Sequence, residues 1–249
     1  MMTIDFRGIP IEIAEMLEAL KQNMSLVEVC EQILKQKIIL QTADSQNITV
    51  TPEEIQNEVD EIRRNKHLEK ASDTMAWLNE QMITPDEWEI VIQNHVLTKK
   101  LAKHLFEEQV EPFFAERRLN FDRFVVYQIS LDCQNLAQEL FYQIEEEEIS
   151  FYEAARLYNL DESARYLCGY TGQKNRLSFS PDIAAAIFQD PLPIGILIGP
   201  LQTEDVYHLL RIEEHIPVEL TPELRQEILH SLFDEWINKE IEYVINMKG

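Results

Sequence analysis

The spacing of apolar residues changes twice along the chain, and this limits the folds that it can adopt. Up to about residue 120, apolar residues recur every three or four positions, as they do on one face of a helix. Residues 124–131, FVVYQISL, are instead β-branched and aromatic, as in a strand. The helical period returns over residues 221–244. The pattern therefore predicts an α+β protein in which helical segments flank a smaller part that contains strands.

Three helix starts carry capping signals. Residues 51–54 read Thr-Pro-Glu-Glu and residues 84–87 read Thr-Pro-Asp-Glu. In both, the threonine hydroxyl and the glutamate three residues later can satisfy free N–H groups of the first turn, and proline fits the first helical position. Ser150 and Glu153 form the same pair at the start of a shorter helix. We expect helices to begin at all three sites.

The last helix predicts how the chain is organised. Its apolar residues form a wide stripe that must be buried against another element. The strand-containing part is already complete, so we expect this helix to pack back on the first, helical module. The predicted domains are a helical module at 1–120, an α/β domain at 121–215 and a C-terminal helix at 216–249. The residues of the stripe are Leu224, Leu229, Ile228, Leu232, Phe233, Trp236, Ile237, Ile241 and Val244.

The predicted α/β domain contains four strands with helices between them. The strand at 124–131 is followed by a helix that runs from about Asn135 into four consecutive glutamates, and then by the helix that Ser150 caps. The remaining segments are GYTG, a turn or short strand; SPDIAAAIF, a short helix; IGILIGPLQ, an apolar strand; and TEDVYHLLRIEE, a last strand. This order predicts a small sheet with helices packed on it.

Charge and cysteine content exclude several classes of function. The chain has 22 basic and 45 acidic side chains, a formal charge of -23, which repels nucleic acid and anionic lipid surfaces. No secretory signal and no long apolar run is apparent, so we expect neither export nor membrane insertion. Cys30, Cys133 and Cys168 are widely spaced and odd in number, which indicates neither a disulfide framework nor a zinc site. We expect a cytoplasmic protein.

Motifs for other chemistries are absent from the sequence. There is no nucleophile elbow, phosphate-binding loop, dinucleotide fingerprint or zinc-protease helix, so we expect no cofactor and no metal. Cys168 is a conceivable nucleophile, although a small apolar filler beside Gly169 fits it better. His208, between Tyr207 and Leu209, has two interpretations: a core histidine satisfied by one hydrogen bond, or a site residue.

The order of these segments resembles the parvulin-type peptidyl-prolyl isomerases joined to a helical chaperone module, as in SurA- and PpiC-like foldases. In the helical part, the resemblance rests on LKQKIILQTADSQNITVTPEEIQNEV, and in the α/β part on FVVYQISL, ISFYEAARLYNLDESA, GYTG and the stretch from SPDIAAAIF to RIEE. It implies a SurA-like helical module with a returning C-terminal helix, and a parvulin-like domain with a four-stranded sheet.

The resemblance also implies site residues. His208 falls on the histidine of the last strand and Asp161 on the acid position, whereas Tyr127 stands where a histidine of the first strand is expected. Phe179, Ile183 and Phe188 correspond to the apolar pocket for the proline ring. We expect His208, Asp161 and Tyr127 to share one cleft with these apolar residues. The segment after the first strand, SLDCQN, lacks the basic loop of phosphate-directed parvulins.

Two functions from different classes follow from the resemblance. The first is a peptidyl-prolyl cis-trans isomerase, a foldase that acts on unfolded or precursor polypeptides with X–Pro bonds. The second is a catalytically weak or inactive chaperone that only binds such clients, or an adaptor in a peptide maturation or export assembly. Tyr127 separates the two, because its phenol either replaces the usual imidazole in the polar network or marks a degenerate site. The oligomeric state is left open.

Overall fold

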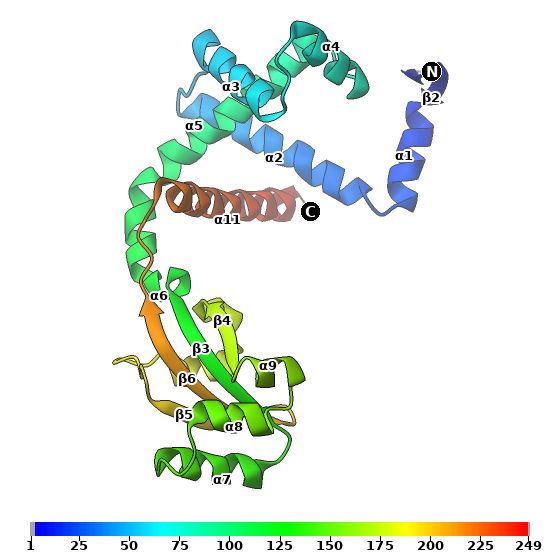
Figure 1. The fold of residues 1–249 in the computed structure, drawn as a ribbon. Helices are drawn as coiled ribbons and strands as arrows, with labels where there is room; N and C mark the ends of the chain where they lie inside the picture. The colour runs from blue at the N-terminus through cyan, green and yellow to red at the C-terminus, as the bar shows by residue number, and fades with distance from the viewer. Residues whose placement is uncertain (1–2, 249) are drawn as a thin grey trace. The chain divides into compact units, whose positions relative to one another are not determined.

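A computed structural model describes residues 3–248 and divides the chain into two units (Figure 1). The first unit comprises Met1–Val110 and Glu223–Gly249, and the second comprises Glu111–Pro222. We call them the helical unit and the α/β unit. Helices and one four-stranded antiparallel sheet make up the two, so the predicted α+β class is confirmed. The domain boundaries expected at 120 and 215 stay a prediction, because contacts do not establish where an independently folding segment ends.

The helical unit begins with a two-stranded hairpin and continues as helices. Within residues 3–248, no helix is both long and apolar enough to span a bilayer. The elements that lie wholly or mainly in this unit are β1 (Thr3–Phe6), β2 (Ile9–Glu12), α1 (Ile13–Gln22), α2 (Leu26–Ser45), α3 (Pro52–Asn65), α4 (Ala71–Glu80), α5 (Pro85–Glu116) and α11 (Pro222–Lys248). The end of α5 beyond Val110 belongs to the α/β unit.

The capping signals lie where the helices begin. The Thr51 hydroxyl accepts from Glu54 N–H at 3.3 Å, and the Glu54 carboxylate accepts from Thr51 N–H at 2.8 Å. Thr84 and Glu87 form the same reciprocal pair at the start of α5, at 3.2 and 2.7 Å. At Ser150 only the hydroxyl half forms, through the bond from Glu153 N–H. All three predicted helix starts are confirmed.

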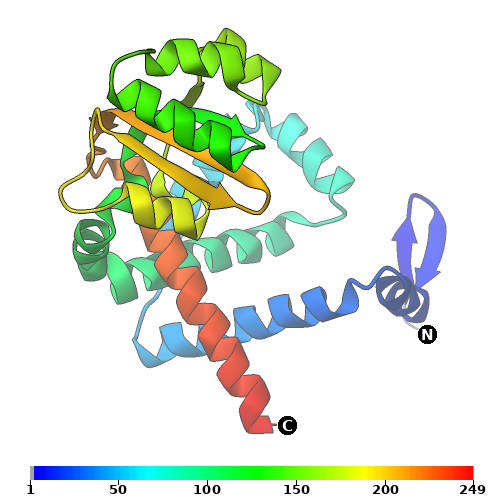
Figure 2. The same ribbon diagram turned by 90° about the horizontal axis from the view of Figure 1, so that it is seen from below.

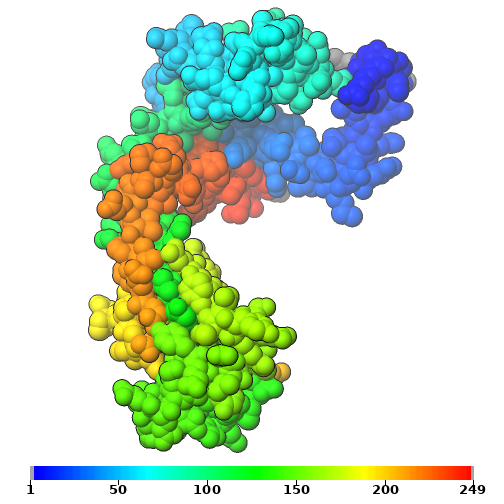
Figure 3. All heavy atoms as spheres, in the orientation of Figure 1, coloured from blue at the N-terminus to red at the C-terminus, as the bar shows by residue number. Residues whose placement is uncertain are grey.

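The C-terminal helix α11 packs within the helical unit, as its apolar stripe predicted. Its residues Ile228, Leu229, Phe233 and Ile237 are each at most 5% exposed. Lys35 of α2 pairs with Asp234 at 3.2 Å, and Phe106 of α5 packs against Trp236 with ring centroids 6.3 Å apart. Both views of the ribbon and the space-filling view show α11, in red, against α2 and α5 (Figures 2 and 3). Helices at opposite ends of the sequence therefore form this unit.

The hairpin at the start of the chain is a feature that the apolar spacing did not predict. Strands β1 and β2 pair antiparallel from Thr3–Glu12 to Phe6–Ile9. Every residue of β1 is exposed, and α1 has no buried residue. With four residues in each strand and little apolar burial, the hairpin gives only a weak sequence signal.

The α/β unit is built on one antiparallel sheet in the order β4-β3-β6-β5. The central strands β3 and β6 are the longest of the four, and β4 and β5 form the edges. The elements in chain order are α6 (Arg118–Phe121), β3 (Arg123–Leu131), α7 (Gln134–Glu145), α8 (Phe151–Tyr158), α9 (Glu162–Tyr166), β4 (Tyr170–Lys174), η1 (Arg176–Ser178), α10 (Pro181–Ile187), β5 (Leu197–Thr203) and β6 (Val206–Ile216).

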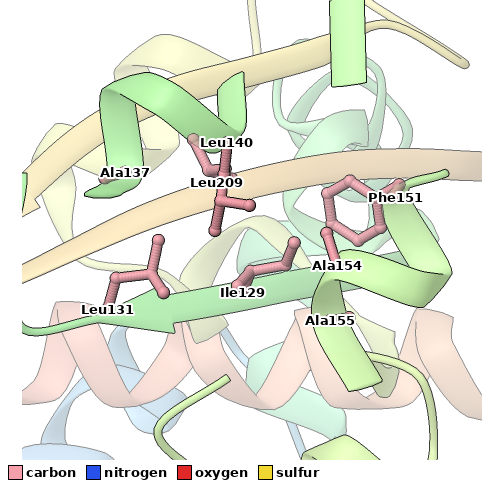
Figure 4. Close-up of a cluster of buried hydrophobic side chains, with 8 residues drawn as sticks. All are labelled: Ile129, Leu131, Ala137, Leu140, Phe151, Ala154, Ala155 and Leu209. Atoms are coloured by element: carbon pink, nitrogen blue, oxygen red, sulfur yellow. The ribbon is translucent and has the colours of Figure 1, made fainter. Parts of the chain in front are cut away.

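The two faces of the sheet carry separate apolar cores. On one face, Ile129, Leu131 and Leu209 pack under α7 and α8; Figure 4 shows them with Ala137, Leu140, Phe151, Ala154 and Ala155. On the other face, α10 contributes Ile183 and Ile187. These pack against the strand residues Phe124, Val126, Leu210 and Ile212. Since side chains of a strand alternate between faces, the face that each site residue occupies follows from the strand register.

Candidate functional site

The register of β3 and β6 determines which polar residues lie together. Ser130 pairs with His208, and Tyr127 pairs with Arg211. Residues directly opposite each other share a face, and neighbours along a strand alternate. His208 therefore shares its face with Ser130 and Gln128, whereas Tyr127 lies on the face that α7 and α8 cover.

The His208 ring is 8% exposed and is surrounded by uncharged polar groups. Its Nδ1 lies 2.9 Å from Gln128 Nε2 and 3.1 Å from Ser130 Oγ, and its Nε2 lies 2.6 Å from Thr203 Oγ1. Gln128 Nε2 also donates to Ser130 Oγ at 3.1 Å. Since an amide NH₂ group only donates, Nδ1 accepts and Nε2 carries the ring proton toward Thr203. We call these four residues the His208 network.

Burial lowers the pKa of His208 below its usual value of 6.5, because a charged ring would lose its hydration. Hydroxyl and amide partners do not carry a negative charge that could offset this loss. In the described part of the chain, His208 forms no ion pair. The imidazole is therefore neutral at pH 7, and each of its nitrogens is hydrogen-bonded.

Asn159 holds the strand segment that carries the His208 network. At Gln128 and Ser130, β3 extends past its pairing with β4, and the side chain of Asn159 provides the hydrogen bonds that a neighbouring strand would make. Its Nδ2 donates to Gln128 O at 2.9 Å, and its Oδ1 accepts from Ser130 N–H at 3.3 Å. Leu160 N–H donates to Ser130 O at 2.8 Å. Asn159 is 2% exposed. It is thus a positioning residue that fixes the backbone between Gln128 and Ser130.

Asp161, the predicted acid of the site, caps a helix. Its Oδ1 accepts from Ser163 N–H at 2.8 Å and from Ala164 N–H at 3.3 Å, at the start of α9. Its own N–H donates to Asn159 Oδ1 at 3.3 Å, so Asp161 reaches the network only through Asn159. Its predicted catalytic role stays a prediction, and the structure assigns its carboxylate a capping bond.

The predicted apolar residues do gather on the face of His208. Phe179 and Phe188 form an edge-to-face pair with centroids 5.8 Å apart, and Phe188 packs on Phe124 at 4.9 Å. Ile183, 7% exposed, belongs to the same cluster as Leu210, which follows His208 two residues along β6. A substrate-binding role for Phe179, Ile183 and Phe188 stays a prediction, but their common location is a finding.

The expectation that Tyr127 shares the site with His208 was wrong. Tyr127 packs on the opposite face, against Tyr152 at 5.2 Å and Tyr170 at 5.4 Å between centroids. The residue of β3 that faces the ring is Gln128, one position along. A shift of one residue in a strand moves a side chain to the other face, which is the physical reason for the error. Ser130 lies opposite His208, and every second residue of a strand shares a face, so Gln128 also lies on the face of His208.

The carboxylates and imidazoles of the described residues form no cluster suited to a metal ion. The α/β unit instead has a neutral polar network beside an aromatic and aliphatic cluster on one face of a β4-β3-β6-β5 sheet. Residues 129–214 match the family described as "Rotamase: PPIC-type PPIASE domain". Residues 129–214 are a parvulin-type domain. The resemblance seen in the sequence is confirmed, and the parvulin domain carries the site described above.

Three further similarities extend over nearly the whole chain. The foldase protein PrsA of Caldanaerobacter subterraneus subsp. tengcongensis is 23% identical over 232 residues, which cover 91% of this chain and 67% of that protein. The crystal structure of PrsA from Bacillus cereus is 15% identical, with a TM-score of 0.52 over 97% of this chain and 88% of that one. A structure of SurA-like chaperones from Campylobacter jejuni, 20% identical, gives a TM-score of 0.36 over 100% and 95%. The chain therefore shares the fold of the Bacillus cereus PrsA structure, with a helical part and a small α/β domain.

Proposed function

We propose that the α/β unit catalyses cis-trans isomerisation of X–Pro bonds in unfolded or precursor polypeptides. The observation that supports this most is the His208 network: a buried, neutral imidazole with both nitrogens hydrogen-bonded, on the same face as Phe179, Ile183 and Phe188. The aromatic and aliphatic cluster suits a proline ring, and the network supplies polar groups next to it.

The chemistry requires no bond to be broken. Rotation about an X–Pro amide passes a barrier of about 20 kcal/mol, because the twisted amide loses its conjugation. An amide nitrogen released from conjugation can accept a hydrogen bond, which a planar amide nitrogen does not. Hydroxyl groups both donate and accept, so Ser130 and Thr203 can exchange these roles through the neutral ring of His208. A network of this kind can adapt its polarity as the amide twists.

The test is the exchange rate between cis and trans forms of X–Pro tetrapeptides, measured by NMR with and without the protein. We expect His208→Ala to remove at least nine tenths of the catalysed rate. Tyr127→Phe is the matched control, because Tyr127 lies on the other face of the same sheet, and it should change the rate less than twofold. Gln128→His places a second imidazole on the face of His208, where Gln128 now contacts the ring, and should raise the rate, because the parvulin resemblance implies a pair of histidines. Equal losses in His208→Ala and Tyr127→Phe would contradict the proposal.

A second function, binding of clients without catalysis, is supported by two observations. Gln128 stands in the position that faces His208, and the Asp161 carboxylate is occupied as a helix cap. On this reading, the wild type shows no exchange rate above buffer but suppresses aggregation of a chemically unfolded client. A wild-type rate above buffer that disappears in His208→Ala excludes the reading.

We also propose that the clients are polypeptides and that the protein works in the cytoplasm. The support for this location is the state of the cysteines: Cys30, Cys133 and Cys168 are free, and the first two are exposed. A reducing compartment keeps such thiols unmodified. Cell fractionation followed by alkylation of the free thiols tests the location, and recovery of the protein outside the cytoplasm would contradict it.

A further inference from the structure

A buried carboxylate at the start of β3 is not part of the His208 network. Asp122 is 1% exposed and is bound through both of its oxygens. Its Oδ2 lies 2.7 Å from Nε2 of His215 on β6, and its Oδ1 accepts from Val218 N–H at 2.9 Å. Arg118 Nε lies 3.9 Å from the same Oδ1. A buried charge requires such partners. Because a carboxylate only accepts hydrogen bonds, Nε2 of His215 carries a proton.

A β-bulge brings His215 to the face of the proposed site. The pairing of β3 with β6 shifts between Val125 and Val126, where β6 contains one extra residue. An extra residue reverses the alternation of faces beyond it. His208 and His215 would lie on opposite faces of a regular strand, but the bulge places both on the same face. The register agrees, because His215 lies opposite Phe124, which belongs to the core on that face.

The ring of His215 extends the aromatic cluster of the proposed proline site. It stacks on Phe124 with centroids 4.8 Å apart and ring planes at 7°. Phe124 is completely buried and packs edge-to-face on Phe188 at 4.9 Å, and Phe188 packs on Phe179 at 5.8 Å. All three distances lie in the range of direct aromatic contact. Asp122 and Phe179 are thus the two ends of one unbroken line of contacts.

Asp122 sets the orientation of this line of rings. A ring nitrogen that is bonded to a fixed carboxylate cannot turn freely, so the plane of His215 is set, and with it the plane that Phe124 stacks on. His215 pairs with Phe124 near the start of β3, whereas His208 pairs with Ser130 near its end. The imidazole of His215 therefore acts on the aromatic cluster and not on the polar network.

We propose that His215 is a positioning residue for the proline site. Its ring, held by Asp122, packs against Phe124 and thereby fixes Phe188 where a proline ring packs on it. The inference rests on the proposed function, because that function assigns Phe188 to the proline ring. His215 should therefore govern the affinity for proline-containing peptides. The exchange rate of the bound peptide should depend on it far less.

Two substitutions separate the ring of His215 from its hydrogen bond. His215→Gln keeps an N–H donor for Asp122 but removes the stacked ring. It should weaken binding of the peptide Ala-Ala-Pro-Phe at least fivefold, while the urea midpoint of the α/β unit stays near that of the wild type. His215→Phe keeps a ring but leaves the buried carboxylate without that donor, so it should lower the midpoint and change the affinity less than twofold. NMR titration measures the affinity, and near-ultraviolet circular dichroism measures the midpoint.

One variant and one peptide serve as controls. His230→Ala removes another imidazole that pairs with a carboxylate, Asp234 at 3.1 Å, but its side chain is 77% exposed and lies in the helical unit. It should change neither affinity nor midpoint. The peptide Ala-Ala-Ala-Phe should bind more weakly than Ala-Ala-Pro-Phe, and its affinity should not respond to His215→Gln. At saturating Ala-Ala-Pro-Phe, the exchange rate in His215→Gln should fall less than twofold.

Three results would overturn the inference. Equal affinities of the wild type and His215→Gln would show that the ring is not needed. Affinity that follows the midpoint, with a larger loss in His215→Phe than in His215→Gln, would reduce His215 to a structural role. Equal binding of the proline and alanine peptides to the wild type would remove the proline site itself. Binding that depends on His215 as expected, with no exchange above buffer, would contradict the isomerase function and support this inference.

Discussion

Asn159→Ala tests whether one side chain replaces a missing strand neighbour. The substitution leaves Gln128 C=O and Ser130 N–H without the partners that Asn159 provides at 2.9 and 3.3 Å. A buried backbone group without a partner costs about 1–3 kcal/mol. Two groups are affected and water gains some access to the new space, so we expect the free energy of unfolding of the α/β unit to fall by about 2–4 kcal/mol. At a urea dependence of about 2 kcal/mol per molar, its unfolding midpoint should fall by about 1–2 M.

The two units can be followed separately in the intact chain. All three tryptophans, Trp77, Trp88 and Trp236, lie in the helical unit, whereas seven of the eight tyrosines lie in the α/β unit. Near-ultraviolet circular dichroism of tyrosine should show the lowered midpoint, and tryptophan fluorescence should not. Asn135→Ala, at an exposed position of α7, is the control and should change stability by less than about 0.5 kcal/mol. A loss below about 0.5 kcal/mol in Asn159→Ala would refute the reasoning.

Three other perturbations have definite expected results. The pKa of His208 is lower in the folded than in the unfolded state, so its contribution to stability is complete above about pH 6.5 and falls as the pH drops through the folded pKa. The urea midpoint detected by tyrosine should therefore fall less between pH 7.5 and 5.5 in His208→Gln than in the wild type. Equal pH dependence in the two proteins would contradict this. Gly199→Ala would place a Cβ 2.5 Å from the His208 carbonyl oxygen, whereas a Cβ at Gly172, also at positive φ, would have nothing within 4 Å. Gly199→Ala should thus lower the urea midpoint of the α/β unit clearly more than Gly172→Ala. Equal effects of the two substitutions would argue against a close approach at Gly199. Deleting residues from Thr221 onward exposes the surfaces that α11 covers, so tryptophan fluorescence should report an unfolded helical unit while the tyrosine signal persists; loss of both signals together would refute the division into two units.

Local chemistry explains why the helix starts could be predicted. At residues 51–54 and 84–87 the capping bonds join groups three residues apart, so the sequence contains both partners. The stripe of α11 was equally readable, because its period fixes which side chains share a face. Its partners in α2 and α5 follow only from the need to bury it.

The site was less predictable because it depends on register. The strand 124–131 was identified correctly, but the residue of β3 that faces His208 was placed one position away, which assigned Tyr127 in place of Gln128. Asn159 carries no sequence signal of its role, since its partners lie 29 and 31 residues away. Asp161 was found by resemblance, but its capping bonds to residues 163 and 164 are local and were readable as an ordinary N-cap.

The central claim is that clients bind on the face of His208 and not on the face of Tyr127. The most direct measurement is an NMR titration of the isotopically labelled protein with a proline-containing peptide. We predict chemical-shift changes centred on Gln128, Ser130, Phe179 and His208, with those of Tyr127 and its neighbours under α7 and α8 unchanged. Shifts centred on Tyr127, with the His208 network unaffected, would contradict the account.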